Sequence, residues 1–150
     1  MGATPIGALR YRNSRHKGVV NILYTYNKMA SRLQKILSRH NLTLAQYNIL
    51  RILSRQHPHP ACNCTIRDQM LDARSDITRI VDRLIKEELV TREACHKDRR
   101  KVNIMLTEEG CRLLERLDSL NDEMDGILKD LSEEELGSLN RLLEKIRKHL

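Results

Sequence analysis

The stretch that decides the fold is residues 75–106, SDITRIVDRLIKEELVTREACHKDRRKVNIML. Its first part spaces apolar residues three and four apart, as on one face of a helix, at Ile77, Ile80, Val81, Leu84 and Ile85. The residues between them are polar or charged. The period then changes, because residues 89–95 and 101–106 are rich in β-branched side chains and partly alternate. We therefore predict a polar-faced helix over residues 75–88 followed by two strands.

The connection between the two predicted strands is basic. It reads HKDRR over residues 96–100 and is too polar to be buried. Upstream, a short helix capped by Asn63 or Thr65 would end near Leu71, and Ser75 would cap the next helix after a three-residue turn. A helix-turn-helix followed by a basic β-hairpin is typical of a winged helix that presents its second helix to DNA. The predicted wing is residues 95–101.

Helices are predicted on both sides of this core. One runs over about residues 17–39, and a second begins at Thr43, in the capping-box sequence TLAQ, and ends near Gln56 before HPHP. A long helix follows residue 107, with an apolar stripe that reaches Leu128, and the last helix follows the capping box Ser132-Glu-Glu-Glu. The apolar stripes of the terminal helices have no obvious partner within the chain, which favours a homodimer.

The fold class is therefore mainly α with a small β-hairpin wing. At 150 residues the chain is expected to form a single domain, residues 1–150. Within it, about residues 43–106 form a DNA-binding core, and residues 17–39 and 107–149 form dimerisation helices. The core must be aliphatic, because the chain contains no Trp and no Phe.

The distribution of charge favours an anionic partner such as double-stranded DNA. The net charge is +7, and the first acidic residue along the chain is Asp68. No apolar run is long enough to span a membrane, the N-terminus does not read as a signal peptide, and the four cysteines do not suggest a secreted disulfide framework. We expect a cytoplasmic protein. No catalytic residue set or phosphate-binding glycine loop is present, so we predict no enzyme activity and no cofactor.

Four segments resemble the MarR (multiple antibiotic resistance regulator) family of winged-helix transcription factors. They are LTLAQ at 42–46, TRIVDRL at 78–84, LVTR at 89–92, and DRR at 98–100 with LTEEG at 106–110. The resemblance covers about residues 17–148. It implies a homodimeric regulator, with the recognition helix in the major groove and the wing at the adjacent minor groove. One departure is Glu88, which stands where family members often have a glycine after the recognition helix.

The polar face of the recognition helix supplies the candidate DNA contacts. Early positions reach base edges, and Arg79 is the best candidate for reading guanine. Later positions are expected to contact phosphates. The acidic residues Asp76 and Asp82 are expected to pair with neighbouring arginines or to read a cytosine. The alternative is an ordinary solvated face. The full set is Ser75, Asp76, Thr78, Arg79, Arg83 and Lys86.

In the wing, the resemblance assigns Asp98 to holding the hairpin and Arg100 to the minor groove, where narrow A·T-rich DNA concentrates negative potential. Lys97, Arg99 and Lys101 are expected to contact the DNA backbone. The alternative is that Asp98 and Arg100 only stabilise the turn.

The resemblance also implies an effector site between the dimerisation helices and the winged helix. Residues suited to an aromatic or phenolic anion in those helices are Tyr24, Tyr26, Arg32 and Tyr47. The alternative is that the tyrosines are core or interface residues and that no small molecule is sensed.

The loop HPHPACNCT, residues 57–65, contains His57, His59, Cys62 and Cys64, which are all possible zinc ligands. The spacings do not match common structural zinc sites, so an inert loop is the favoured interpretation and no metal is predicted. A metal- or thiol-redox-responsive regulator that uses this loop remains an alternative, as does a winged-helix protein-interaction module without DNA binding. Cys95 and Cys111 are expected to be structural, on a strand and a helix.

Overall fold

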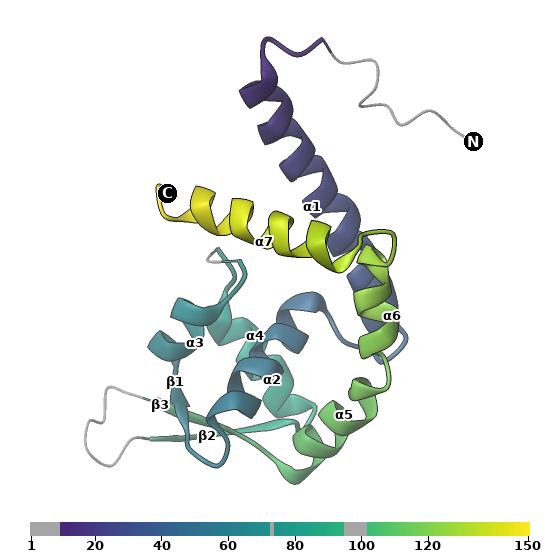
Figure 1. The fold of residues 1–150 in the computed structure, drawn as a ribbon. Helices are drawn as coiled ribbons and strands as arrows, with labels where there is room; N and C mark the ends of the chain where they lie inside the picture. The colour runs from purple at the N-terminus through teal and green to yellow at the C-terminus, as the bar shows by residue number, and fades with distance from the viewer. Residues whose placement is uncertain (1–9, 73, 95–101) are drawn as a thin grey trace. The chain divides into compact units, whose positions relative to one another are not determined.

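The computed structural model describes residues 10–72, 74–94 and 102–150. The described residues form helices and a small antiparallel sheet (Figure 1), which confirms the predicted fold class. The chain divides into two compact units, residues 1–44 and residues 45–150. In the described part of the chain, none of the helices is long and apolar enough to cross a membrane.

The first unit is dominated by the helix α1, Ser14–Ser38, which contains no acidic residue. The Asn13 side chain caps its start by accepting a hydrogen bond from the His16 amide at 2.9 Å. After its end, the Gln34 side chain donates to the Leu42 carbonyl at 3.1 Å and accepts from the Leu44 amide at 2.8 Å. These two bonds hold the turn that leads into the second helix.

The winged-helix part of the second unit follows in the predicted order. It contains α2 (Leu44–Gln56), α3 (Asn63–Gln69), α4 (Ile77–Lys86), β2 (Val90–Ala94) and β3 (Val102–Leu106). The short strand β1, Ala61–Cys62, was not predicted, and it lies in the segment expected to be a loop. The sheet has the order β1-β3-β2 and is antiparallel, with Ala61 opposite Ile104 and Val90 opposite Leu106.

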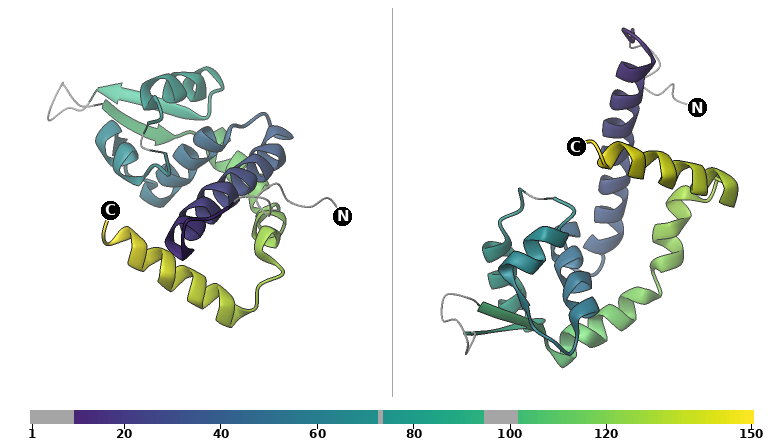
Figure 2. Two further views of the ribbon diagram at one scale, coloured as in Figure 1. Left: turned by 90° about the horizontal axis from the view of Figure 1, so that it is seen from above. Right: turned by 60° about the vertical axis from the view of Figure 1, so that its left-hand side comes forward.

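The aliphatic core of this part lies between the helices and the sheet. The helix α3 contacts α4, β1 and β3, and α4 contacts β2 (Figures 1 and 2). The fully buried side chains are aliphatic, as the composition requires: Ile49, Leu50, Ile52, Leu53, Ile66, Val81, Leu84, Val90, Ile104 and Leu117. This core gives α4 a fixed inner face.

The predicted long helix after residue 107 is wrong, because the structure divides it into α5 (Glu108–Asp118), α6 (Asn121–Asp125) and the 3₁₀ helix η2 (Gly126–Leu128). The chain changes direction between α5 and α6 (Figure 2). At this point the Leu120 amide bonds to the Leu117 carbonyl at 2.9 Å, three residues back, so the α-helical ladder stops. The last helix, α7 (Glu133–Arg147), begins with the predicted Ser132–Glu135 capping box.

Thr107 and Gly110 join α5 to the end of α4, the helix Ile77–Lys86. The Thr107 hydroxyl donates to the Glu88 carbonyl at 2.7 Å and accepts from the Gly110 amide at 2.9 Å. A Cβ atom at Gly110 would collide with the Leu89 carbonyl oxygen and lie 3.2 Å from a methyl group of Leu106. The LTEEG segment therefore needs its threonine as a helix cap and its glycine for close approach.

Candidate nucleic-acid interface

The helix α4 has one buried and one exposed face. Ile77, Val81 and Leu84 point into the core with exposed fractions of 5%, 0% and 0%. The positions between them, Thr78, Arg79, Asp82, Arg83 and Lys86, are exposed. The predicted candidates on this helix are therefore brought together on a single solvent-facing surface.

The start of α4 differs from the prediction. Asp76 caps the helix, because its carboxylate accepts a hydrogen bond from the Arg79 amide at 3.2 Å. The predicted cap, Ser75, is wrong; its amide bonds to the Asp72 carbonyl at 3.2 Å within the preceding turn. Aspartate suits the position because a carboxylate accepts readily from helix N-terminal amides. This places Thr78 and Arg79 in the first turn.

The acidic residue in the middle of the exposed face is paired. Asp82 forms an ion pair with Arg92 of β2 at 2.7 Å, with side chains 50% and 31% exposed. This agrees with the interpretation that Asp82 pairs with a nearby arginine. Arg92 was not among the predicted site residues, although it lies in the LVTR segment. The pair links α4 to the sheet.

The remaining cations of α4 carry no such partner. Within the described part of the chain, the side chains of Arg79, Arg83 and Lys86 make no hydrogen bond or ion pair. Their charges are therefore directed to solvent from one helical face. A surface of this kind attracts the phosphates of a nucleic acid.

The end of α4 is held by two features. The chain turns after Glu87 in a Schellman arrangement, in which the Leu89 amide bonds to the Leu84 carbonyl and the Glu88 amide to the Ile85 carbonyl, both at 3.0 Å. Glu88 supplies the left-handed conformation itself, with φ of 58°. The residue that stands where family members often have glycine thus adopts a left-handed conformation at some conformational cost.

Gln46 of α2 provides the second feature. It is a buried polar side chain, 2% exposed, and its amide nitrogen donates to both carboxylate oxygens of Glu87, at 3.4 and 3.2 Å. Sequence reasoning assigned Gln46 only to a capping box. The contact joins residues 41 positions apart in the sequence, which no local pattern could have indicated.

The predicted wing contacts lie outside the described residues. Lys97, Asp98, Arg99, Arg100 and Lys101, together with Cys95, belong to the segment between β2 and β3. The strands on either side of it pair from Val90 opposite Leu106 to Ala94 opposite Val102. The base of the predicted hairpin is therefore a regular antiparallel pair of strands.

The predicted effector residues fall in both units. Tyr24, Tyr26 and Arg32 lie on α1, and the Lys28 ammonium lies 5.3 Å from the centre of the Tyr24 ring. Tyr47 lies on α2, where its hydroxyl accepts a hydrogen bond from the Arg51 guanidinium at 2.9 Å. Tyr47 is therefore already engaged by a neighbouring cation.

Arg51 also reaches the end of α5. Its guanidinium contacts the Asp118 carboxylate at 2.5 Å, and this hydrogen bond holds the pKa of Asp118 below its ordinary value of 3.8. The side chains are 26% and 53% exposed. This ion pair connects α2, which precedes the recognition helix, with the helix that follows the sheet.

The loop that contains four possible zinc ligands is closed by a disulfide bond. Cys62 and Cys64 form a disulfide bond, so neither sulfur is a free thiolate ligand in this structure. Among the described residues, no group of three or more His, Cys, Asp or Glu side chains could hold a metal ion. Cys62 also caps α3, which corrects the expectation that Asn63 or Thr65 would do so. Cys111 is a free cysteine on α5.

A basic helix held against a three-stranded sheet defines this chain as a winged helix-turn-helix protein. The profile of the MarR family matches residues 42–102, which run from just before α2 to the first residue of β3. The chain belongs to the MarR family.

Similar proteins agree with this assignment. The chain is 35% identical to the HTH-type transcriptional regulator PecS of Dickeya dadantii, over 79% of this chain and 72% of that protein. It is 30% identical to the homoprotocatechuate degradative operon repressor of Escherichia coli, over 84% of each chain. A crystal structure of an E. coli MarR variant complexed with operator DNA is 25% identical, with a TM-score of 0.74, and covers 83% of this chain and 89% of that one. These relatives are transcription regulators rather than enzymes.

Proposed function

We propose that this protein is a homodimeric, sequence-specific DNA-binding repressor that responds to a small ligand. The observation that carries the proposal is the exposed face of α4, on which Arg79, Arg83 and Lys86 have no partner among the described residues. DNA is the partner that such a face fits best, and the similar E. coli MarR variant was crystallised with operator DNA. The E. coli relative named as a repressor supports the direction of regulation.

The geometry of α4 supports different DNA contacts at the two ends of the helix. Thr78 and Arg79 lie in the first turn, where side chains of a recognition helix reach base edges in the major groove. An arginine there can donate two hydrogen bonds to guanine. Arg83 and Lys86 lie in the last turns and are proposed to contact phosphates, which provide affinity without sequence information. Ser75 and the capping Asp76 border this surface.

The wing is proposed to add contacts beside the helix. By resemblance to the family, Arg100 enters the minor groove and Asp98 holds the hairpin. Lys97, Arg99 and Lys101 are proposed to contact the backbone. The paired strands β2 and β3 support this, since Ala94 and Val102, on either side of the segment, lie opposite each other at one end of the strand pair.

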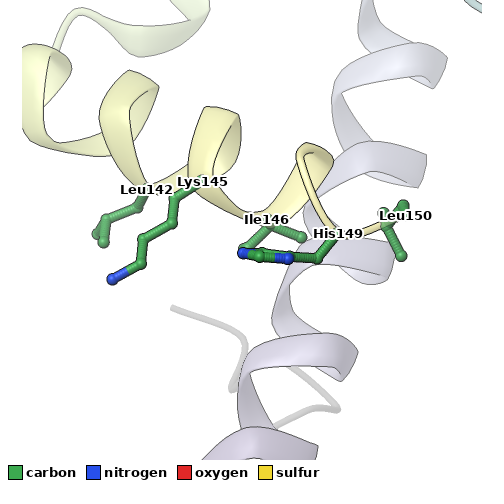
Figure 3. Close-up of a pocket in the computed structure, with 5 residues that line it drawn as sticks. All are labelled: Leu142, Lys145, Ile146, His149 and Leu150. Atoms are coloured by element: carbon green, nitrogen blue, oxygen red, sulfur yellow. The ribbon is translucent and has the colours of Figure 1, made fainter.

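Homodimerisation is proposed because both ends of the chain carry exposed apolar side chains. On α1, Val19, Ile22, Leu23 and Tyr26 are spaced as one helical face, and each is between 42% and 58% exposed. At the other end of the chain, Leu142 and Ile146 of α7 and Leu150 after it line an open pocket together with Lys145 and His149 (Figure 3). A second copy would cover these faces and present two recognition helices to a pseudo-palindromic operator.

The ligand is proposed to be an aromatic or phenolic anion that contacts Tyr24, Tyr26, Arg32 and Tyr47. Support comes from their side chains, which combine aromatic rings with a cation, and from the similar E. coli protein named for a homoprotocatechuate degradative operon. The ligand would have to bind one spacing of the two recognition helices more tightly than another, because only differential affinity shifts a conformational equilibrium.

Selection of bound sequences from random duplex DNA tests the proposal. We expect enrichment of an inverted repeat whose half-sites lie about one helical turn, or about 34 Å, apart. The logarithm of the affinity should fall linearly with that of the salt concentration, with a slope of about −0.9 per phosphate contacted. Repeating the selection with phenolic acids tests the ligand. A winged-helix module that acts only through protein contacts would enrich no sequence and show no steep salt dependence.

A further inference from the structure

Asp82 is the only acidic residue of the helix Ile77–Lys86. It follows Arg79 by three positions and precedes Lys86 by four, so these three side chains share one stripe of the exposed face. Either cation could therefore have paired with the carboxylate along the helix. The structure instead pairs Asp82 Oδ1 with Nη2 of Arg92 on β2, at 2.7 Å. This choice of partner leaves both cations of the stripe available to DNA.

Arg92 is held by the sheet. It lies in the middle of β2, where it pairs with Ile104 of β3, a residue that is 0% exposed. Residues directly opposite each other in an antiparallel pair point to the same face, so Arg92 extends from the face that carries the core. The helix α4 contacts β2. The ion pair thus joins two regular elements, which orient the Asp82 carboxylate more firmly than a loop would.

The Asp82 carboxylate keeps one acceptor that no protein group uses. Over residues 10–72, 74–94 and 102–150, Oδ2 makes no hydrogen bond or ion pair, and the side chain is 50% exposed. A lone carboxylate at this position would be repelled by the phosphates of DNA, but the guanidinium of Arg92 offsets its charge. The pair therefore presents an open acceptor to DNA without adding net negative charge.

The donor on a base edge that fits this acceptor is the N4 amino group of cytosine. In the major groove a carboxylate accepts from cytosine N4, whereas the amino group of adenine lies beside the acceptor N7, which would repel a second carboxylate oxygen. Three helical residues rise about 4.5 Å, close to the spacing of about 3.4 Å between base pairs. Asp82 is therefore placed to meet the base pair next to the one proposed for Arg79.

We propose that Asp82 is a specificity-determining residue that recognises one cytosine in each half-site, and that Arg92 is its positioning residue. The inference rests on the proposed function in taking duplex DNA as the partner. Oδ2 of Asp82 accepts from the cytosine amino group while Arg92 holds Oδ1. In this assignment Arg92 contacts neither base nor phosphate and acts through Asp82.

Selection from random duplex DNA with the full chain tests Asp82. The wild type should prefer cytosine at one position of each half-site by about ten-fold, within the range that one base contact provides. Asp82→Ala should bind all four bases there alike, and Asp82→Asn should move the preference to adenine, because an amide both donates and accepts. An Asp82→Ala variant that still required cytosine at every selected position would overturn the assignment.

The matched control is Glu93→Gln, which removes a carboxylate from the neighbouring position of β2. Successive residues of a strand point to opposite faces, so Glu93 extends away from the side that Arg92 occupies. This variant should select the wild-type sequence. If Glu93→Gln lost the cytosine preference as Asp82→Ala does, the effect would come from net charge and not from a base contact.

Titrations with selected and random duplexes test Arg92. Arg92→Gln should weaken binding to both by about ten-fold, because the Asp82 charge is then unpaired beside the phosphates. In the Asp82→Asn background the same substitution should change either affinity by less than about two-fold, since no charge is left to offset. If the loss persisted in that background and the salt slope fell by about one, Arg92 would be a phosphate contact and the positioning role would be overturned.

This inference and the proposed function fail in different ways. If the wild type selects no sequence, DNA recognition by α4 fails and the inference fails with it. If the wild type selects an operator in which no base preference responds to substitution of Asp82, the inference alone fails. Thermal unfolding checks the fold of each variant, which should unfold near the wild-type temperature because a partly exposed ion pair contributes little stability.

Discussion

Arg79 and Lys86 share the exposed face of α4 but lie at its two ends. We expect Arg79→Ala to relax the preference for one base pair in each half-site, at a cost of about 1–3 kcal/mol for the cognate sequence. We expect Lys86→Ala to weaken specific and random duplexes alike and to reduce the salt slope by about one, because a phosphate contact is lost. Titrations against both kinds of duplex at several salt concentrations measure the two effects.

The control for these variants is Lys129→Ala, which removes an exposed lysine between η2 and α7. It should leave both affinities unchanged. If Arg79→Ala and Lys86→Ala reduced binding to specific and random DNA equally, Arg79 would be a phosphate contact and not a base-reading residue.

Gly110 is a second residue whose role can be isolated. Its missing side chain admits the Leu89 carbonyl, so Gly110→Ala should lower the free energy of unfolding by about 1–3 kcal/mol, as overpacking does. Gly137→Ala on α7 is the matched control, since a Cβ there meets nothing within 4 Å. It should raise stability by up to about 1 kcal/mol through helix propensity. Urea denaturation measures both, and similar values for the two variants would contradict the close-approach argument.

Between elements, the Arg51–Asp118 ion pair makes the stability of the fold depend on pH. Because Arg51 lowers the pKa of Asp118 in the folded protein, the pair stabilises the fold at pH values above 3.8, the ordinary value of the carboxyl group. This contribution is lost as the pH falls through the lowered pKa and the carboxylate takes up a proton. Thermal unfolding should therefore show a stability gap between the wild type and Asp118→Asn at pH 6.

That gap should close in strongly acidic buffer and should narrow at high salt, because both side chains are partly exposed. The neighbouring variant Asp122→Asn, which alters an acid on α6, serves as the control. A gap that stayed constant from pH 6 down to pH 2 would show that the ion pair is not its source.

Most of the elements could be predicted because their signals are local. The apolar spacing of Ile77, Val81 and Leu84 fixed the inner face of α4, and all three are buried. The sequence SEEE predicted the start of α7, where Ser132 and Glu135 form the capping box. The strand pair also followed from its own residues, which is why β2 and β3 lie where alternation placed them.

The features that were missed depend on partners far away in the sequence. The strand β1 is too short for a periodic pattern and exists because Ala61 and Cys62 pair with β3. The break after Asp118 lies within an apolar stripe that looks continuous. Ser75 and Asp76 are both good caps, so local preference could not decide between them. In the candidate site, Gln46 and Arg92 were missed because each contacts α4 from another element.

For the whole molecule, dimerisation is the first expectation to test. Sedimentation equilibrium should give about twice the chain mass of 17.5 kDa. Leu142→Glu with Ile146→Glu should weaken the dimer by at least about a hundred-fold, or about 2.7 kcal/mol, because charges would replace two exposed apolar side chains of α7. Leu71→Glu, at an 80% exposed leucine beyond α3, is the control. A wild-type protein that sediments at 17.5 kDa at micromolar concentration would reject the dimer.

The division of the segment after the sheet into α5, α6 and η2 has a mechanical consequence. An unbroken helix over this length, roughly 30 Å, would act as a stiff rod. Two breaks in the helix, after Asp118 and at Gly126, allow this segment, called the arm below, to bend instead. If this arm connects the winged helix of each copy to the dimer interface, the dimer can still bind when one half-site is moved by one base pair, a shift of about 3.4 Å along the duplex.

We therefore expect operators lengthened or shortened by one base pair to keep binding within about ten-fold, or about 1.4 kcal/mol. Gly126→Ala, where an added Cβ meets nothing within 4 Å, should stiffen the chain at the second break and narrow this tolerance without weakening the optimal operator. Competition titrations measure the affinity for the optimal operator and for the operators that are one base pair longer or shorter. If Gly126→Ala changed none of the ratios between these affinities, the helix break at Gly126 would not be the source of the tolerance. Broken helices in this arm would thus let one regulator serve promoters whose sites differ in length.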